Sequence, residues 1–194
     1  MLKNKILLCI SIILLLCLIL FDGYKIYQNK RLEQSDIVSM HMSDIMEIWY
    51  LSNDLCNLLD SNSEQQYRLM LINSTLHRFT RRLGPILQLD NSEDSLRMYQ
   101  FFDKLCEKIN KLEANGDIKR LDEVLEQEFS MNTEKLYELY KSIYDESDNF
   151  LKMWEREFGS IYGIGNSLKE YKAGIDLMHN YATNLMKVCN NVME

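Results

Sequence analysis

Apolar residues recur every three or four positions along most of the chain, which is the spacing of one face of an α-helix. The first such stripe begins at Val38 and ends at Leu59. A helix advances about 1.5 Å per residue. The stripe therefore predicts one continuous helix whose length is comparable to the diameter of a small domain. Its members are Val38, His41, Ile45, Ile48, Ser52, Leu55 and Leu59, flanked by Met42, Trp49 and Cys56.

Five further segments show the same spacing, and turn signals separate them. The segment that begins at Leu69 is predicted to end at Gly84-Pro85, because proline lacks a backbone donor and clashes with the preceding helical turn. Asp90-Asn91-Ser92 and Asn132 or Thr133 offer side-chain oxygens that cap helix starts. The apolar positions of the five segments are Leu69, Ile72, Leu76, Phe79 and Leu83; Met98, Phe102, Leu105, Ile109 and Leu112; Ile118, Leu121, Leu125 and Phe129; Leu136, Tyr137, Tyr140, Ile143, Tyr144, Phe150, Leu151, Trp154 and Phe158; and Leu168, Tyr171, Ile175, Met178, Ala182, Leu185, Cys189 and Val192.

Such sustained stripes with short connections predict an all-α fold, an antiparallel bundle of four to five long helices. The chain has one proline, Pro85, and seven glycines in 194 residues, which leaves it free to form long helices. No segment shows the strict alternation of a β-strand.

A different pattern opens the chain. Ile6 to Phe21 is an unbroken apolar run of 16 residues, preceded by Lys3 and Lys5. A membrane-spanning helix needs roughly 20 mainly apolar residues, and the tyrosines that follow the run suit an interface. The run therefore predicts one N-terminal transmembrane helix that is not cleaved. A cleaved signal peptide is the main alternative, but cleavage after Gly23 would place the bulky Phe21 where a small residue is needed.

The sequence divides into a short basic N-terminus at 1–5, a transmembrane signal-anchor helix at 6–23, a juxtamembrane helical linker at 24–36 and a helical bundle domain at 37–194. No strong helix breaker lies in the linker, so the anchor is expected to continue into the first bundle helix. This layout is similar to that of chemoreceptor ligand-binding domains. No second apolar run follows, so we expect no cytoplasmic output domain on this chain.

The orientation follows from the basic start of the anchor. We expect the N-terminus inside and the bundle outside the cytoplasm, on the surface of a bacterium, although basic residues are nearly balanced across the run. The reversed topology is the alternative.

The net charge is −7 overall; without Lys3 and Lys5 the rest of the chain holds 20 basic and 29 acidic residues, or −9. Phosphate backbones repel such a domain, so no nucleic-acid partner is expected.

Candidate metal ligands are few. Met40-His41-Met42 and Met46 offer soft ligands of the kind that hold copper, but successive residues point in different directions on a helix. Asp176 and His179 share the i, i+3 spacing of bundle metal motifs, as do His41 and Asp44. The chain lacks the Glu-x-x-His pairs of a di-iron site, so we expect no metal, no cofactor and no enzyme activity.

Three other groups of residues are predicted to have structural rather than functional roles. The basic cluster before Gly84 is expected to interact with a helix C-terminus, with an acidic partner as the alternative. Tyrosines at helical spacing are expected to be core residues with hydroxyls at the rim. Three domain cysteines cannot all pair, so buried free thiols are expected. The groups are His77, Arg78, Arg81 and Arg82; Tyr137, Tyr140 and Tyr144; and Cys56, Cys106 and Cys189.

The leading functional hypothesis is a membrane-anchored, non-enzymatic interaction or scaffold protein that binds a protein partner or a second copy of itself. The alternative is a small-ligand or metal-sensing bundle that signals through a separate membrane protein, with His41 and Ser52 lining a shallow inner pocket. A third hypothesis is a cytoplasmic assembly factor with the reversed topology.

Overall fold

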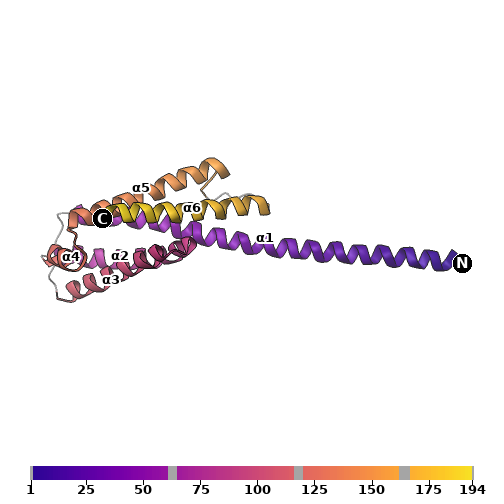
Figure 1. The fold of residues 1–194 in the computed structure, drawn as a ribbon, viewed down its shortest axis with the longest axis horizontal. Coiled ribbons are helices and arrows are strands. Elements are labelled where there is room, and N and C mark those ends of the chain that lie inside the picture. The colour runs from indigo at the N-terminus through magenta and orange to yellow at the C-terminus, as the bar shows by residue number, and fades with distance from the viewer. Residues whose placement is uncertain (1, 61–64, 116–119, 162–166, 194) are drawn as a thin grey trace.

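A computed structural model describes the backbone of residues 2–60, 65–115, 120–161 and 167–193, with side chains from residue 14 onward except 61–66, 116–119 and 162–166. Within these ranges the chain forms six α-helices (Figure 1). The all-α prediction is confirmed. The helices are α1 (Leu2–Asp60), α2 (Gln65–Asp90), α3 (Glu93–Asn115), α4 (Leu121–Phe129), α5 (Thr133–Phe158) and α6 (Leu168–Met193).

The five long helices form an antiparallel bundle, and the short α4 lies at one end of it (Figure 1). α1 packs against α2, α5 and α6, while α3 packs mainly against α2. α1 extends far beyond the bundle on its N-terminal side, and the C-terminus lies at the opposite end of the bundle. We call residues 14–37 of α1 the stalk and residues 38–60 the packed half of α1.

The stripes read from the sequence form the core. Ile45 and Ile48 of α1 are fully buried, as are Phe79 of α2 and Phe102 of α3. The Phe79 ring lies 5.2 Å from Phe102 and 5.3 Å from Tyr140 of α5, both edge-to-face. Aromatic rings favour this geometry because the edge of one ring meets the electron-rich face of the next.

Side chains satisfy the backbone groups that helix ends leave free. Asn132 caps α5, as predicted, because its Oδ1 accepts a 2.8 Å hydrogen bond from the Lys135 amide. The guanidinium of Arg68 in α2 donates to the carbonyls of Leu58 and Leu59 at the end of α1, at 2.7 and 2.6 Å. α2 therefore holds the C-terminus of α1.

The predicted end of the second helix at Gly84-Pro85 is wrong. α2 continues through Pro85 to Asp90, and Ile86 and Leu87 beyond the proline are buried in the core. The carbonyl deprived of a donor belongs to Arg81, an exposed residue where water can take its place. Packing of the last turns outweighs the local cost of proline.

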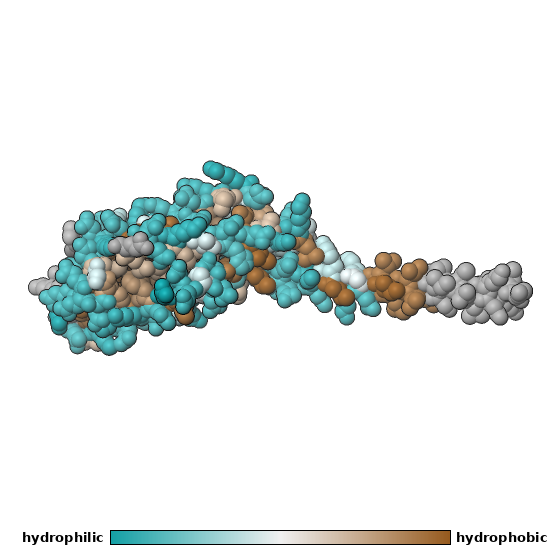
Figure 2. All heavy atoms as spheres, viewed as in Figure 1, coloured by the Kyte–Doolittle hydropathy of each residue, from teal (hydrophilic) through white to brown (hydrophobic). Residues whose placement is uncertain are grey.

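α1 runs without a break from Leu2 to Asp60, so residues 24–36 are helical and continue into the bundle, as expected. Exposed apolar side chains cover the described start of the stalk, from Leu14 to Phe21 (Figure 2). Among the described residues no helix has an apolar stretch long enough to cross a membrane. The predicted transmembrane helix at 6–23 is thus not supported by the structure; the side chains of its residues 6–13 lie outside the described part.

Candidate functional site

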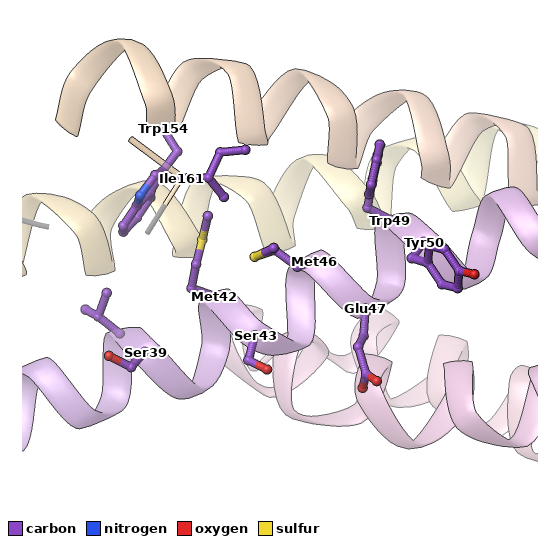
Figure 3. Close-up of a pocket in the computed structure, with 10 residues that line it drawn as sticks. Ser39, Met42, Ser43, Met46, Glu47, Trp49, Tyr50, Trp154 and Ile161 are labelled. Carbon is purple, nitrogen blue, oxygen red and sulfur yellow. The ribbon is translucent and has the colours of Figure 1, made fainter. Parts of the chain in front are cut away.

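An apolar pocket lies on the side of α1 that faces the end of α5, at the stalk end of the bundle (Figure 3). Its volume is about 480 Å³, within the range of roughly 300–1,000 Å³ of small-molecule sites. Figure 3 shows Met42 and Met46 pointing toward the side of the pocket formed by Trp154 and Ile161. The lining residues are Val38, Ser39, Met42, Ser43, Met46, Glu47, Trp49, Tyr50, Trp154 and Ile161.

Helical spacing brings the α1 side chains together. Met42, Met46 and Trp49 are four and three residues apart, so they share one face of α1. The Trp49 ring stacks on Tyr144 of α5 at 5.7 Å. Trp154 is 1 % exposed, and its ring lies 4.5 Å from that of Phe158. Ring contacts thus hold both tryptophans in place, and the pocket walls are preformed.

An ion-pair network lies on the neighbouring face of α1. Arg82 of α2 donates to the Asp44 carboxylate at 2.9 Å and contacts Glu47 as well. Arg78 lies 3.5 Å from Glu47. The Asp44 side chain is 5 % exposed, whereas that of Arg82 is 41 % exposed. Glu47 lines the pocket, but in Figure 3 its side chain extends away from Trp154 and Ile161.

This network corrects the interpretation of the basic cluster. α2 does not end at Gly84, so these cations do not lie at a helix C-terminus. Arg78 and Arg82 instead pair with acidic residues of α1. His77 and Arg81 are exposed on α2. Two of the four members of the cluster therefore pair with the chain's own first bundle helix.

The pocket surface offers few polar groups. The indole nitrogens of Trp49 and Trp154 are shielded from solvent and have no hydrogen-bond partner among the described residues. The hydroxyls of Ser39 and Ser43 border the pocket. In the described lining no histidine, lysine or arginine stands beside these serines to act as a base.

His41 and Ser52 were expected to line a shallow inner pocket. Neither residue lines the apolar pocket. Ser52 is fully buried, and its Oγ donates to the Ile48 carbonyl at 2.6 Å within α1. His41 is buried beside Asp44. Both polar residues are thus buried on the packed face of the helix.

The candidate metal ligands are likewise not brought together. Met42 and Met46 share the pocket, but Met40 is exposed and His41 lies in the core. Across the side chains that the structure describes, no group of three or more His, Cys, Asp or Glu residues could hold a metal ion. The Nδ1 of His179 hydrogen-bonds the Leu89 carbonyl of α2 at 2.7 Å, so it joins α6 to the end of α2.

A polar cluster around Asp90 fixes the turn between α2 and α3. Its carboxylate accepts hydrogen bonds from Ser92, from Ser95 at 2.9 Å and from Thr183 of α6 at 2.8 Å. The bond from Ser92 is the main reason that the pKa of Asp90 is lowered. Asp90, which was expected only as part of a helix start, therefore also joins α2, α3 and α6.

The three domain cysteines lie in the core with free thiols. Burial raises the pKa of Cys56 to about 11 and that of Cys189 to about 12, and it raises the pKa of Cys106. Thiols react as thiolates, so these three are poor nucleophiles at neutral pH. Cys17 of the stalk is exposed.

The tyrosines of α5 are core residues, as predicted, but the hydroxyl of Tyr140 is buried without a hydrogen-bond partner among the described residues, so it does not lie at the rim. Tyr140 is fully buried, while Tyr137 and Tyr144 are half-buried. Tyr144 supports Trp49 from the far side of the pocket. A strip that resembled a binding surface is thus part of the core that shapes the pocket.

The pocket itself was missed by the sequence analysis. Trp49 was recognised only as a residue flanking a stripe, Met42 as a flanking residue and a candidate metal ligand, and Trp154 as part of the face of another helix. The flanking position was the available signal, since residues at the edge of a stripe line the boundary between core and solvent. No local sequence signal indicates which distant residues pack against Met42 and Trp49.

Comparison with protein-family models, with curated proteins and with solved structures finds no match to this chain.

Proposed function

We propose that this chain is a non-enzymatic binding protein held at a membrane by its N-terminal helix, with the pocket between α1 and the end of α5 as its binding site. One observation carries the proposal: the pocket is lined mainly by α1, the same helix that continues through the stalk into the apolar run. An apolar concave site with few polar groups is the usual form of a small-molecule site. An occupant would contact the helix that leads to the membrane.

Support for membrane attachment comes from the sequence and the stalk together. The apolar run Ile6–Phe21 precedes the linker, and the described part of it exposes large apolar side chains all around the helix. Water solvates such a surface poorly, and a lipid bilayer would cover it. The bundle is then proposed to lie outside the cytoplasm, with the basic N-terminus inside.

Membrane attachment is tested by fractionating cells that make the full chain. The chain is expected in the membrane fraction after an alkaline wash, and the variant Leu15→Lys/Ile19→Lys is expected in the wash because two charges disfavour insertion. Full release of the unmodified chain by the wash would contradict the proposal.

Orientation is tested with a cysteine at an exposed site of the packed half of α1, Asn57→Cys. With Cys9 and Cys17 replaced by serine, a membrane-impermeant maleimide should label it in intact cells, while the buried Cys56, Cys106 and Cys189 give little background. Labelling only after lysis would indicate the reversed topology.

Binding is tested by mass spectrometry of small molecules retained from a cell extract by the purified full chain. We expect the unmodified chain and Met40→Asp to retain the same molecules and Met46→Asp to lose them. Met40 is exposed outside the pocket and Met46 lines it, although both are methionines of α1. Equal retention by all three chains, or none by any, would contradict the proposal.

A protein partner or a second copy of the chain is the other candidate function, and the stalk favours it. Ile26 and Leu32 are 66 % and 56 % exposed, and a contacting protein would remove these side chains from water. Crosslinking in native membranes should then recover a complex larger than one chain. Recovery of the uncomplexed monomer alone would remove this candidate.

A further inference from the structure

We infer that the occupant of the pocket is a small, uncharged and mainly apolar molecule. This inference rests on the proposed binding function, and it adds the chemical class of the ligand. It depends on three features of the pocket: its lining, its charges and its distance from the membrane.

The lining is apolar and adaptable. The thioethers of Met42 and Met46 face the Trp154 side of the pocket (Figure 3). Methionine is flexible and polarisable, so it adjusts to the outline of an apolar or aromatic molecule. The indole N–H groups of both tryptophans are shielded from solvent, so the rings present carbon surface rather than donors. Such walls bind a ligand through apolar contact area rather than through hydrogen bonds.

The charges disfavour ions of either sign. Among the lining residues that the structure describes there is no lysine, arginine or histidine, so an anion would find no counter-charge from them. The one acid in the described part of the lining is Glu47, and Arg82 and Arg78 already pair with it. A cation would therefore find no free carboxylate. Moving a charge from water into an apolar site without a partner is strongly unfavourable.

The position of the pocket disfavours a lipid of the anchoring membrane. Met42 lies 21 residues beyond Phe21 along one continuous helix, which is about 30 Å at the rise of an α-helix. That distance equals the thickness of a whole hydrocarbon core. A lipid that kept its place in the bilayer would not reach the pocket, so the molecule is expected to arrive from the aqueous side.

The chain provides its own probe for this inference. It contains two tryptophans, and both line the pocket, so fluorescence excited selectively in tryptophan reports on this site. The ligands are three naphthalenes of matched size: 2-acetylnaphthalene, which is neutral, 2-naphthoate and 2-naphthylmethylammonium. The full chain is reconstituted in phosphatidylcholine nanodiscs, and the same nanodiscs carrying Met46→Asp correct for partition into lipid.

We expect a saturable change of fluorescence with 2-acetylnaphthalene and binding of both ions at least about ten-fold weaker. Met40→Asp should bind like the unmodified chain, and Met46→Asp should not bind. The helix signal in circular dichroism is measured for each variant. If Met46→Asp lowers it, the uncharged variant Met46→Asn replaces it, with a weakened rather than abolished binding.

Tighter binding of either ion would overturn the proposed ligand class, while retention of small molecules from the cell extract would still support the binding function. Absence of saturable binding by all three naphthalenes would also overturn it. So would a photoreactive residue at Met46 that links to a second polypeptide in native membranes, because the occupant would then be a protein partner.

Discussion

The two halves of α1 share one continuous backbone but depend on different interactions. In the packed half, Ile45, Ile48 and Leu51 are fully buried against neighbouring helices. In the stalk, Ile26 and Leu32 are exposed on a helix that leaves the bundle. Isolated helices are marginal in water because nucleation is costly. Burial against neighbouring helices stabilises the packed half, whereas the described stalk is continuous with it but exposed.

The pocket lies at the boundary between the stalk and the packed half of α1. It begins at Val38, the first fully packed position of α1, and ends at Tyr50. Across it, α5 ends at Phe158, so fewer side chains of the described helices cover α1 there. Incomplete packing along one helix produces a site with preformed walls on one side and access to solvent on the other.

Truncation of one isoleucine in each half tests the contrast most strongly. Ile45→Ala should lower the free energy of unfolding by about 2–5 kcal/mol, because it leaves a cavity in the core. Ile26→Ala should change it by less than about 0.5 kcal/mol, because the stalk side chain has no core around it. Urea denaturation of the full chain, followed by circular dichroism, measures both. Similar losses for the two variants would show that the stalk is packed against something.

Ion pairs offer the same comparison between buried and exposed sites. Arg82→Gln should cost about 2 kcal/mol, because it leaves the buried Asp44 carboxylate without its charged donor. The guanidinium is partly exposed, which keeps the cost below that of a fully buried pair. Arg97→Gln, in an exposed pair with Glu93 on α3, should cost about 0–1 kcal/mol.

The double variant Asp44→Asn/Arg82→Gln sharpens this prediction. It should recover part of the loss, because no buried charge is then left unpaired. A loss equal to the sum of the two single variants would show that Asp44 and Arg82 act independently, and the network would then be incidental to the fold.

Pro85 in α2 gives a third test, which compares tertiary packing with local helix propensity. Pro85→Ala should raise the free energy of unfolding by about 1 kcal/mol, because alanine restores a backbone donor and has a high helix propensity. The gain should be smaller than the full propensity difference, since the proline lies on a helix already held by Ile86 and Leu87. Thermal unfolding of the two chains measures it. A lower unfolding temperature in the variant would mean that the proline shapes α2 in a way the core requires.

The sequence predicted the faces of the helices well. Every apolar residue of the first stripe, from Val38 to Leu59, is buried, because periodicity directly reports which side of a helix avoids water. Asn132 was recognised as the start of a helix because capping is a local interaction. The continuity of α1 followed from the lack of breakers between the anchor and the bundle.

The sequence could not predict which faces meet. Asp44 and Arg82 are 38 positions apart, and Trp154 reaches the pocket of Met42 from another helix. Periodicity gives the side that a residue occupies but not its neighbour across the interface. The error at Pro85 has the same cause, since the packing that keeps α2 helical comes from distant residues. The candidate site depends on such pairings and was therefore missed.

Acid should weaken the packed half of α1 slightly, through His41. Burial lowers the pKa of His41 below its ordinary value of 6.5, Asp44 opposes this shift and His179 adds to it. The unfolded chain then binds the proton more tightly than the folded chain. The stability contributed by neutral His41 is complete above the unfolded pKa and is lost as the pH falls below about 6.5. His41→Gln should reduce the fall in unfolding free energy between neutral and mildly acidic pH, and His77→Gln, at an exposed site, should not. An unchanged pH profile in His41→Gln would show that the pKa of His41 is the same in the folded and unfolded chains, and a steeper fall would show that Asp44 holds the histidine charged in the folded chain.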